Sequence, residues 1–204
     1  MTKPKLTYFD APMSRGEECR LAFHLAGVDF EDERLKRDAW PALKPTTPFG
    51  SLPVLTLPNK PPLAQSNAIL VLIGRQHDLH PKDDFEAARH EAVMAHVEDL
   101  RAQISPTMRM TDEAQKKAAR EQLAANVVPS WAAKTDAQIA DDGPFFAGNK
   151  IHVVDLKLLM ITRWIRSGVL DHIPKTAFDG AKKLLRVHDA VDADPRIKAW
   201  YAKK

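Results

Sequence analysis

Proline is distributed unevenly along this chain of 204 residues, and this feature constrains the fold most strongly. Ten of the 15 prolines lie before residue 82. Proline has no backbone N–H and a fixed φ, so it interrupts helices and is confined to turns, edge strands and first helical turns. After about residue 83 the chain is rich in alanine and has apolar residues at helical spacing. The pattern predicts a first part of short strands and turns, followed by a helical part.

The length allows two domains, because a domain takes roughly 150 residues and smaller ones are common. We expect an α/β domain over residues 1–76, a linker over 77–84 and an all-helical domain over 85–204. The expected linker contains two histidines and a proline, which suit a connecting segment better than a helix or strand.

Charge, hydropathy and cysteine content exclude several classes of protein. The 30 Lys+Arg residues nearly balance the 27 Asp+Glu residues, which argues against nucleic acid as a partner. The longest clean apolar stretch, Ala68–Ile73, is far too short to cross a membrane, and residues 1–5 do not resemble a secretory signal. Cys19 is the only cysteine, which rules out an intramolecular disulfide and fits a reducing compartment. We therefore expect a cytoplasmic protein.

The first part has alternating strand and helix signals. Strands are expected at Lys5–Phe9, Phe30–Leu35 and Leu52–Leu57 and around Leu63, and helices from Arg15 to a stop at Gly27 and from an N-cap at Ser66 to about Arg75. This order of elements predicts an α/β unit whose sheet has mixed strand pairing. In the second part, we expect Thr111 to open a helix that Pro129 kinks or ends.

Several motifs occur in an order that resembles the cytosolic glutathione transferases. They are Leu6-Thr7-Tyr8-Phe9, Arg15-Gly16-Glu17, Trp40-Pro41-Ala42-Leu43-Lys44, Pro48-Phe49-Gly50-Ser51-Leu52-Pro53-Val54-Leu55 and Ala64-Gln65-Ser66-Asn67-Ala68-Ile69. Near the end, the turn Phe146–Lys150 before Asp155 and the segment Asp194–Trp200 extend the resemblance. It is strongest to the sigma-like, Tyr-type classes. The resemblance implies a thioredoxin-like N-terminal domain followed by a helical bundle, and glutathione as co-substrate without a tightly bound cofactor.

The resemblance also implies which residue ionises the thiol of glutathione. A free thiol has a pKa of about 8.5, so a hydrogen-bond donor beside the sulfur is needed to favour thiolate at neutral pH. Tyr8, at the end of the first expected strand, takes this role, and Ser14 is the alternative donor. Arg15 resembles the arginine that supports the thiolate, although the Tyr8–Arg15 interval is one residue longer than usual. Cys19 lies on the apolar face of its expected helix, so we expect it to be a buried structural thiol.

Other motif residues would hold the rest of glutathione. The Leu52–Pro53 bond is expected to be cis, which would turn the backbone of Leu52 toward the cysteinyl part. Gln65 and Ser66 stand at a helix start, which favours the γ-glutamyl carboxylate. Trp40 and Lys44 would reach the glycyl carboxylate.

The helical part supplies the remaining expected site residues. Asp99, with Glu98 as second choice, resembles the acid that reaches the neighbouring subunit's glutathione, so we expect a homodimer. Phe9, Met13 and Met108, the last near Pro106, would line a pocket for an apolar electrophile. Asp155 stands where a capping-box acid belongs, with His152 in the usual place of Ser or Thr, and is expected to be structural.

The chain is thus expected to be a dimeric glutathione transferase. A glutathione-dependent isomerase or peroxidase would use the same thiolate and remains an alternative. So does a relative that binds glutathione or apolar ligands without catalysis. No metal site is expected, because His77 and His80 lie in a linker that offers no rigid ligand set.

Overall fold

The computed structural model describes residues 3–202, which divide into two compact units. Unit 1 contains the chain up to Ala87 and again from Asp194 onward, and unit 2 contains Ala88–Ala193. The last helix therefore clusters with the beginning of the chain, although it follows the helical part in sequence.

Unit 1 contains a four-stranded sheet in the order β2-β1-β3-β4. The strands are β1 (Lys5–Phe9), β2 (Glu31–Leu35), β3 (Val54–Thr56) and β4 (Leu63–Ala64). β1 pairs with β2 in parallel, and β3 pairs antiparallel with both β1 and β4. The expected mixed pairing is confirmed.

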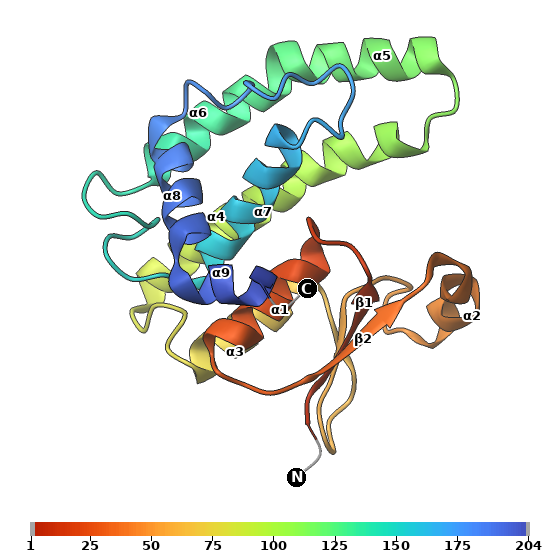
Figure 1. Cartoon of the computed structure of the whole chain (residues 1–204), viewed down its shortest axis with the longest axis vertical. Coiled ribbons are helices and arrows are strands. Elements are labelled where there is room, and N and C mark those ends of the chain that lie inside the picture. The colour runs from red at the N-terminus through yellow and green to blue at the C-terminus, as the bar shows by residue number, and fades with distance from the viewer. Residues whose placement is uncertain (1–2, 203–204) are drawn as a thin grey trace. The chain divides into compact units, whose positions relative to one another are not determined.

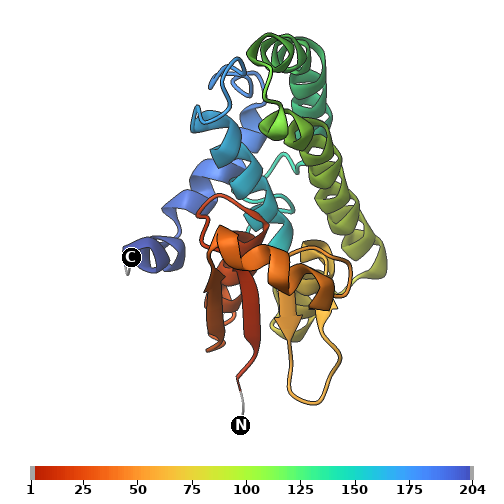
Figure 2. The same cartoon turned by 90° about the vertical axis from the view of Figure 1, so that its right-hand side faces the viewer.

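Helices cover both faces of this sheet. α1 (Arg15–Leu25) and α3 (Ser66–Gln76) pack on one face, and α2 (Trp40–Leu43), between η1 (Arg37–Ala39) and η2 (Lys44–Thr46), lies over the other (Figures 1 and 2). α1 ends where predicted, because Gly27 adopts a φ of 66° that side chains other than glycine rarely adopt. The last helix, α9 (Pro195–Ala202), packs on α1. The core between these elements is apolar and fully buried at Leu6, Leu21, Leu55, Ile69 and Leu70.

The start of α3 differs from the prediction. Gln65, not Ser66, occupies the N-cap position, and Ser66 is already the first helical residue. Gln65 has a φ of 73°, a left-handed conformation that is uncommon for a residue with a side chain. The chain therefore turns sharply between β4 and α3, which sets the direction of the first helical N–H groups.

Unit 2 is helical. Its elements are most of α4 (Asp84–Ile104), η3 (Ser105–Arg109), α5 (Glu113–Gln122), η4 (Leu123–Val127), α6 (Val128–Gln138), α7 (Val153–Arg166) and α8 (Lys182–Ala193). α5, η4 and α6 follow one another as one long helical run (Figure 1). α7 is the central helix, and Leu156, Leu158, Leu159 and Ile161 on it are all fully buried.

Two expectations for this helical run need correction. The helix begins at Glu113, not Thr111, because the Asp112 side chain accepts hydrogen bonds from the backbone N–H groups of Ala114 and Gln115. Pro129 does not end the run, so that part of the prediction is wrong, and a kink stays a prediction. The π-helical η4 directly precedes Pro129, which lies in the first turn of α6.

The N-terminus of α7 has the capping box that the sequence predicts. The Asp155 carboxylate accepts hydrogen bonds from the backbone N–H groups of His152 and Phe146, both at 2.7 Å. Asp155 is fully buried, and burial raises its pKa to about 7, although the two N–H donors oppose the rise. Asp155 thus ties the Phe146 turn to the start of the central helix.

None of the helices within residues 3–202 is long and apolar enough to cross a membrane.

Candidate active site

The strand register of unit 1 aligns three of the expected site residues in one row. Thr7 pairs with Val54 across β1 and β3, and Val54 pairs with Ala64 across β3 and β4. Tyr8, Pro53 and Gln65 each come directly next to these paired residues along the chain. They therefore stand at the same end of three neighbouring strands.

The residues around this row come from the segments between the strands. The Leu52–Pro53 peptide bond is cis, as expected. The ring of Phe9 meets that of Trp40 edge to face, with centroids 5.8 Å apart, so the end of β1 contacts the start of α2. The side chain of Lys44 runs close to Gly50, where a Cβ would lie 3.5 Å from the Lys44 Cε. Trp40, the first residue of α2, and Lys44, the first residue of η2, thus lie beside residues close in sequence to Tyr8 and Pro53.

Tyr8 is packed from two sides. A Cβ added at Gly16 would stand 2.7 Å from the Tyr8 Cβ, and closer still to the ring carbons Cγ and Cδ1. The Tyr8 ring therefore rests directly on the backbone of the first turn of α1. The guanidinium carbon of Arg20 lies 6.0 Å from the centroid of the same ring. This glycine and this arginine restrict where the phenol can lie.

The first turn of α1 carries the other candidates for the thiol donor. The Ser14 hydroxyl donates a hydrogen bond to the carbonyl of Ala11 at 2.8 Å, so its proton already has an acceptor within the turn. Arg15 is the first residue of α1. Met13 is half-buried in the turn before it, and Cys19 is a fully buried thiol outside any disulfide, as expected.

The remaining expected residues belong to unit 2. Asp99 on α4 is 75% exposed, and its carboxylate lies 4.0 Å from His96 Nδ1. Partial burial lowers the pKa of His96, although the charge of Asp99 opposes this and Lys134 adds to it. Glu98 differs, because it accepts hydrogen bonds from the buried Lys157 at 2.6 Å and from Arg101 at 2.9 Å. Met108 lies on η3 and is 49% exposed.

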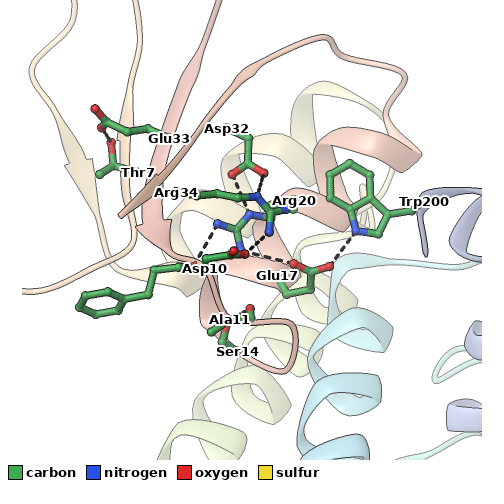
Figure 3. A network of polar contacts seen from close by, with 11 residues as sticks. Thr7, Asp10, Ala11, Ser14, Glu17, Arg20, Asp32, Glu33, Arg34 and Trp200 are labelled. Atoms are coloured by element: carbon green, nitrogen blue, oxygen red, sulfur yellow. Dashed lines mark hydrogen bonds and ion pairs between the residues drawn. The ribbon is translucent and has the colours of Figure 1, made fainter. Parts of the chain in front are cut away.

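A network of charged side chains around Arg20, which packs against the Tyr8 ring, was not expected from the sequence (Figure 3). Glu17 and Arg20 on α1 are fully buried, and they form an ion pair. Asp32 and Arg34 on β2 continue the network to Asp10 at the end of β1. Glu17 and Arg20 are three residues apart on the buried face of a helix, and this spacing is the signal that could have indicated them.

In the part of the chain from residue 3 to 202, no cluster of three or more His, Cys, Asp or Glu side chains could hold a metal ion.

Family models match both parts of the chain. The glutathione S-transferase N-terminal domain matches residues 4–75, and the C-terminal domain of the same family matches residues 98–204. The chain belongs to the glutathione S-transferase family. This agrees with the thioredoxin-like sheet and the helical second part described above. The chain is accordingly a glutathione transferase, an enzyme whose co-substrate is glutathione.

Relatives of this glutathione transferase cover nearly its whole length. Glutathione S-transferase 1 of Ascaris suum is 34% identical, and the match covers 100% of this chain and 98% of the relative. Hematopoietic prostaglandin D synthase of Gallus gallus is 30% identical over 100% and 98% of the two chains. The solved structure of prostaglandin synthase D of Nilaparvata lugens superposes with a TM-score of 0.87 at 31% identity, covering 99% of this chain and 98% of that one.

Proposed function

We propose that this glutathione transferase ionises glutathione with a hydrogen bond from the Tyr8 hydroxyl and adds the thiolate to an apolar electrophile. The row of Tyr8, Pro53 and Gln65 carries the proposal. An extended tripeptide spans about 10 Å, and three strands about 4.8 Å apart have a similar width. Glutathione therefore fits along the row, with its cysteine near the middle and its sulfur toward Tyr8.

Tyr8 is the proposed donor, in preference to Ser14. A hydrogen bond to a thiolate stabilises the charged form and lowers the pKa of the thiol. The Ser14 proton is already donated to Ala11 and would have to leave that bond. Arg15 is proposed to add positive charge beside the thiolate from the first turn of α1.

The rest of the tripeptide is assigned to the neighbouring backbone and side chains. The backbone of Leu52, next to the cis Pro53, pairs with the cysteinyl part like an added strand. Gln65 and Ser66 present the N-terminus of α3 to the γ-glutamyl carboxylate. Trp40 and Lys44 bind the glycyl carboxylate. Glutathione binding is thus assigned to residues 1–76, with 77–84 as linker and 85–204 as the helical domain.

A homodimer is proposed, in which Asp99 reaches the glutathione of the partner subunit. Asp99 is exposed, whereas Glu98 is held by Lys157 and Arg101, which favours Asp99 as the acid. Phe49 and Phe85 are 68% and 73% exposed, and large apolar side chains of this kind are often covered in an assembly.

Phe9 and Met13 of unit 1 are proposed to line the electrophile pocket, and Met108 stays a prediction for the same role. Methionine side chains adapt to varied apolar shapes, which suits a range of substrates. The cytoplasm is the proposed location, because Cys19 is the single cysteine and forms no intramolecular disulfide, which fits a reducing compartment.

The test is conjugation of glutathione to a chlorinated nitroaromatic, in which the thiolate forms the new C–S bond and chloride leaves. Tyr8→Phe removes only the hydroxyl and is expected to lower kcat/KM about 100-fold, as the loss of one charge-stabilising donor does elsewhere. Ser14→Ala is the matched control and should keep most of the activity. A wild-type protein that binds glutathione without conjugating it would overturn the transferase assignment, and an unimpaired Tyr8→Phe enzyme would move the donor to Ser14.

A second candidate function is a glutathione-dependent isomerase. It is favoured by the two prostaglandin D synthases among the relatives, one in sequence and one in structure. Formation of prostaglandin D in the presence of glutathione tests this function. Product formation that Tyr8→Phe abolishes would establish it, and the absence of product would leave conjugation as the activity.

A further inference from the structure

The charged network is centred on Arg20, whose guanidinium group is held by three different parts of unit 1. Arg20 Nε donates to Asp32 on β2 at 2.8 Å, and one terminal nitrogen donates to Glu17 on α1 at 3.3 Å. The other terminal nitrogen donates to the carbonyl of Phe9, the last residue of β1, at 3.2 Å. Every nitrogen of this fully buried group therefore has an assigned acceptor, and its position is fixed.

This position matters for Tyr8 in two ways. The bond to the Phe9 carbonyl fixes the backbone immediately after Tyr8. The guanidinium group also packs against the phenol ring, with its central carbon 6.0 Å from the ring centroid, and restricts where the ring can lie. A shift of Arg20 would thus change the position and orientation of the Tyr8 hydroxyl.

Glu17 orients Arg20, and Trp200 orients Glu17. The two carboxylate oxygens of Glu17 are divided, since Oε2 accepts from Arg20 and Oε1 accepts from the indole N–H of Trp200 at 2.7 Å (Figure 3). Trp200 lies on α9, which packs against α1 within unit 1. Its ring is stacked with Phe30, with centroids 6.4 Å apart, and lies beside His24 at 5.3 Å, so packing holds it in place.

We propose that Trp200 is a positioning residue for the thiol chemistry, acting through Glu17 and Arg20 on Tyr8. This inference rests on the proposed role of Tyr8. The carboxyl-terminal helix is then a working part of the glutathione-binding unit, because it supplies a hydrogen bond from a residue 183 positions away from Glu17. Without the indole donor, the buried Glu17 carboxylate loses a charge-assisted hydrogen bond and turns to find another, and Arg20 moves with it.

The test is Trp200→Phe, which keeps an aromatic ring against Phe30 and His24 but removes the N–H together with the five-membered part of the indole. The pKa of bound glutathione is read from the ultraviolet absorbance of its thiolate during a pH titration, without an electrophile. We expect this pKa to rise by about half a unit, which is about a three-fold smaller thiolate-to-thiol ratio. The pH profile of kcat/KM should shift in the same direction.

Trp131→Phe is the matched control. The indole N–H of Trp131 in unit 2 also donates to a backbone carbonyl, that of His96, at 2.8 Å, and Trp131 is 4% exposed. Both variants should lose some thermal stability, but only Trp200→Phe should move the thiol titration. An equal shift in both variants, or none in Trp200→Phe, would overturn the positioning role.

A second set of variants tests the route through Glu17. Glu17→Gln should raise the pKa of bound glutathione at least as much as Trp200→Phe, and adding Trp200→Phe to it should change the pKa little further. Additive shifts would show that Trp200 acts by another route. If the wild-type protein itself shows no lowered thiol pKa, the proposed role of Tyr8 fails, whereas a lowered pKa that Trp200→Phe leaves unchanged refutes only the present inference.

Discussion

Replacement of Gly16 by alanine should lower catalytic activity at the site far more than it lowers the stability of the protein. In an ordinary helix, alanine is about 1 kcal/mol more favourable than glycine. Here the new methyl group would stand 2.7 Å from the Tyr8 Cβ and closer to the ring, whereas ordinary carbon contacts lie at about 3.5–4.0 Å. The ring would have to move by about 1 Å or more.

For stability, the two effects oppose each other: the helix propensity of alanine raises the free energy of unfolding, and overpacking against Tyr8 lowers it. Activity is only lowered. Overpacking costs about 1–3 kcal/mol, so the gain in helix propensity leaves a net loss of about 0–2 kcal/mol in the free energy of unfolding. A misplacement of about 1 Å in a catalytic group costs about 100-fold in rate. We therefore expect kcat/KM to fall far more than stability does.

The assay compares Gly16→Ala with Gly180→Ala by urea unfolding and by conjugation kinetics. A Cβ at Gly180 would meet nothing within 4 Å, so that variant should keep wild-type kinetics. In a Tyr8→Phe background, Gly16→Ala should cost little further activity, since the hydroxyl whose position it disturbs is already absent. Wild-type kcat/KM in Gly16→Ala would refute the view that the backbone of α1 sets the position of Tyr8.

The other predictions concern unit 2. The pKa of Asp155, about 7 in the folded protein, lies above the ordinary value of 3.8, so its contribution to stability should be fullest at low pH and decline as the pH rises toward 7. Denaturant unfolding of wild type and Asp155→Asn at several pH values measures this, and a wild-type advantage that grows with pH would show that the hydrogen bonds to the carboxylate outweigh burial. Asp99→Ala should weaken glutathione binding about ten-fold, equivalent to about 1.4 kcal/mol, by calorimetry. Glu121→Ala, an exposed acid elsewhere in unit 2, is the control, and an unchanged dissociation constant for Asp99→Ala would refute the assignment of Asp99.

Much of the local structure in both units could be predicted from the sequence because its signals are local. The strand at Lys5–Phe9, the helix stop at Gly27 and the capping box at Asp155 each depend on residues close together in the chain. The same is true of the cis bond at Pro53, which follows from a short motif that resembles a known family. The start of α3 was missed, because the left-handed conformation of Gln65 is imposed by the turn out of β4 and is not a preference of glutamine.

The sequence alone determined which residue types stand at the ends of the strands and at the helix starts, and hence the family that the chain resembles. Only the tertiary structure decided the row of Tyr8, Pro53 and Gln65, since strand register depends on pairing between distant segments. It also decided that Trp200 meets Glu17. A buried carboxylate forms hydrogen bonds with the donors that packing places next to it, and packing depends on the whole unit. Strand and turn propensities, in contrast, act over a few residues.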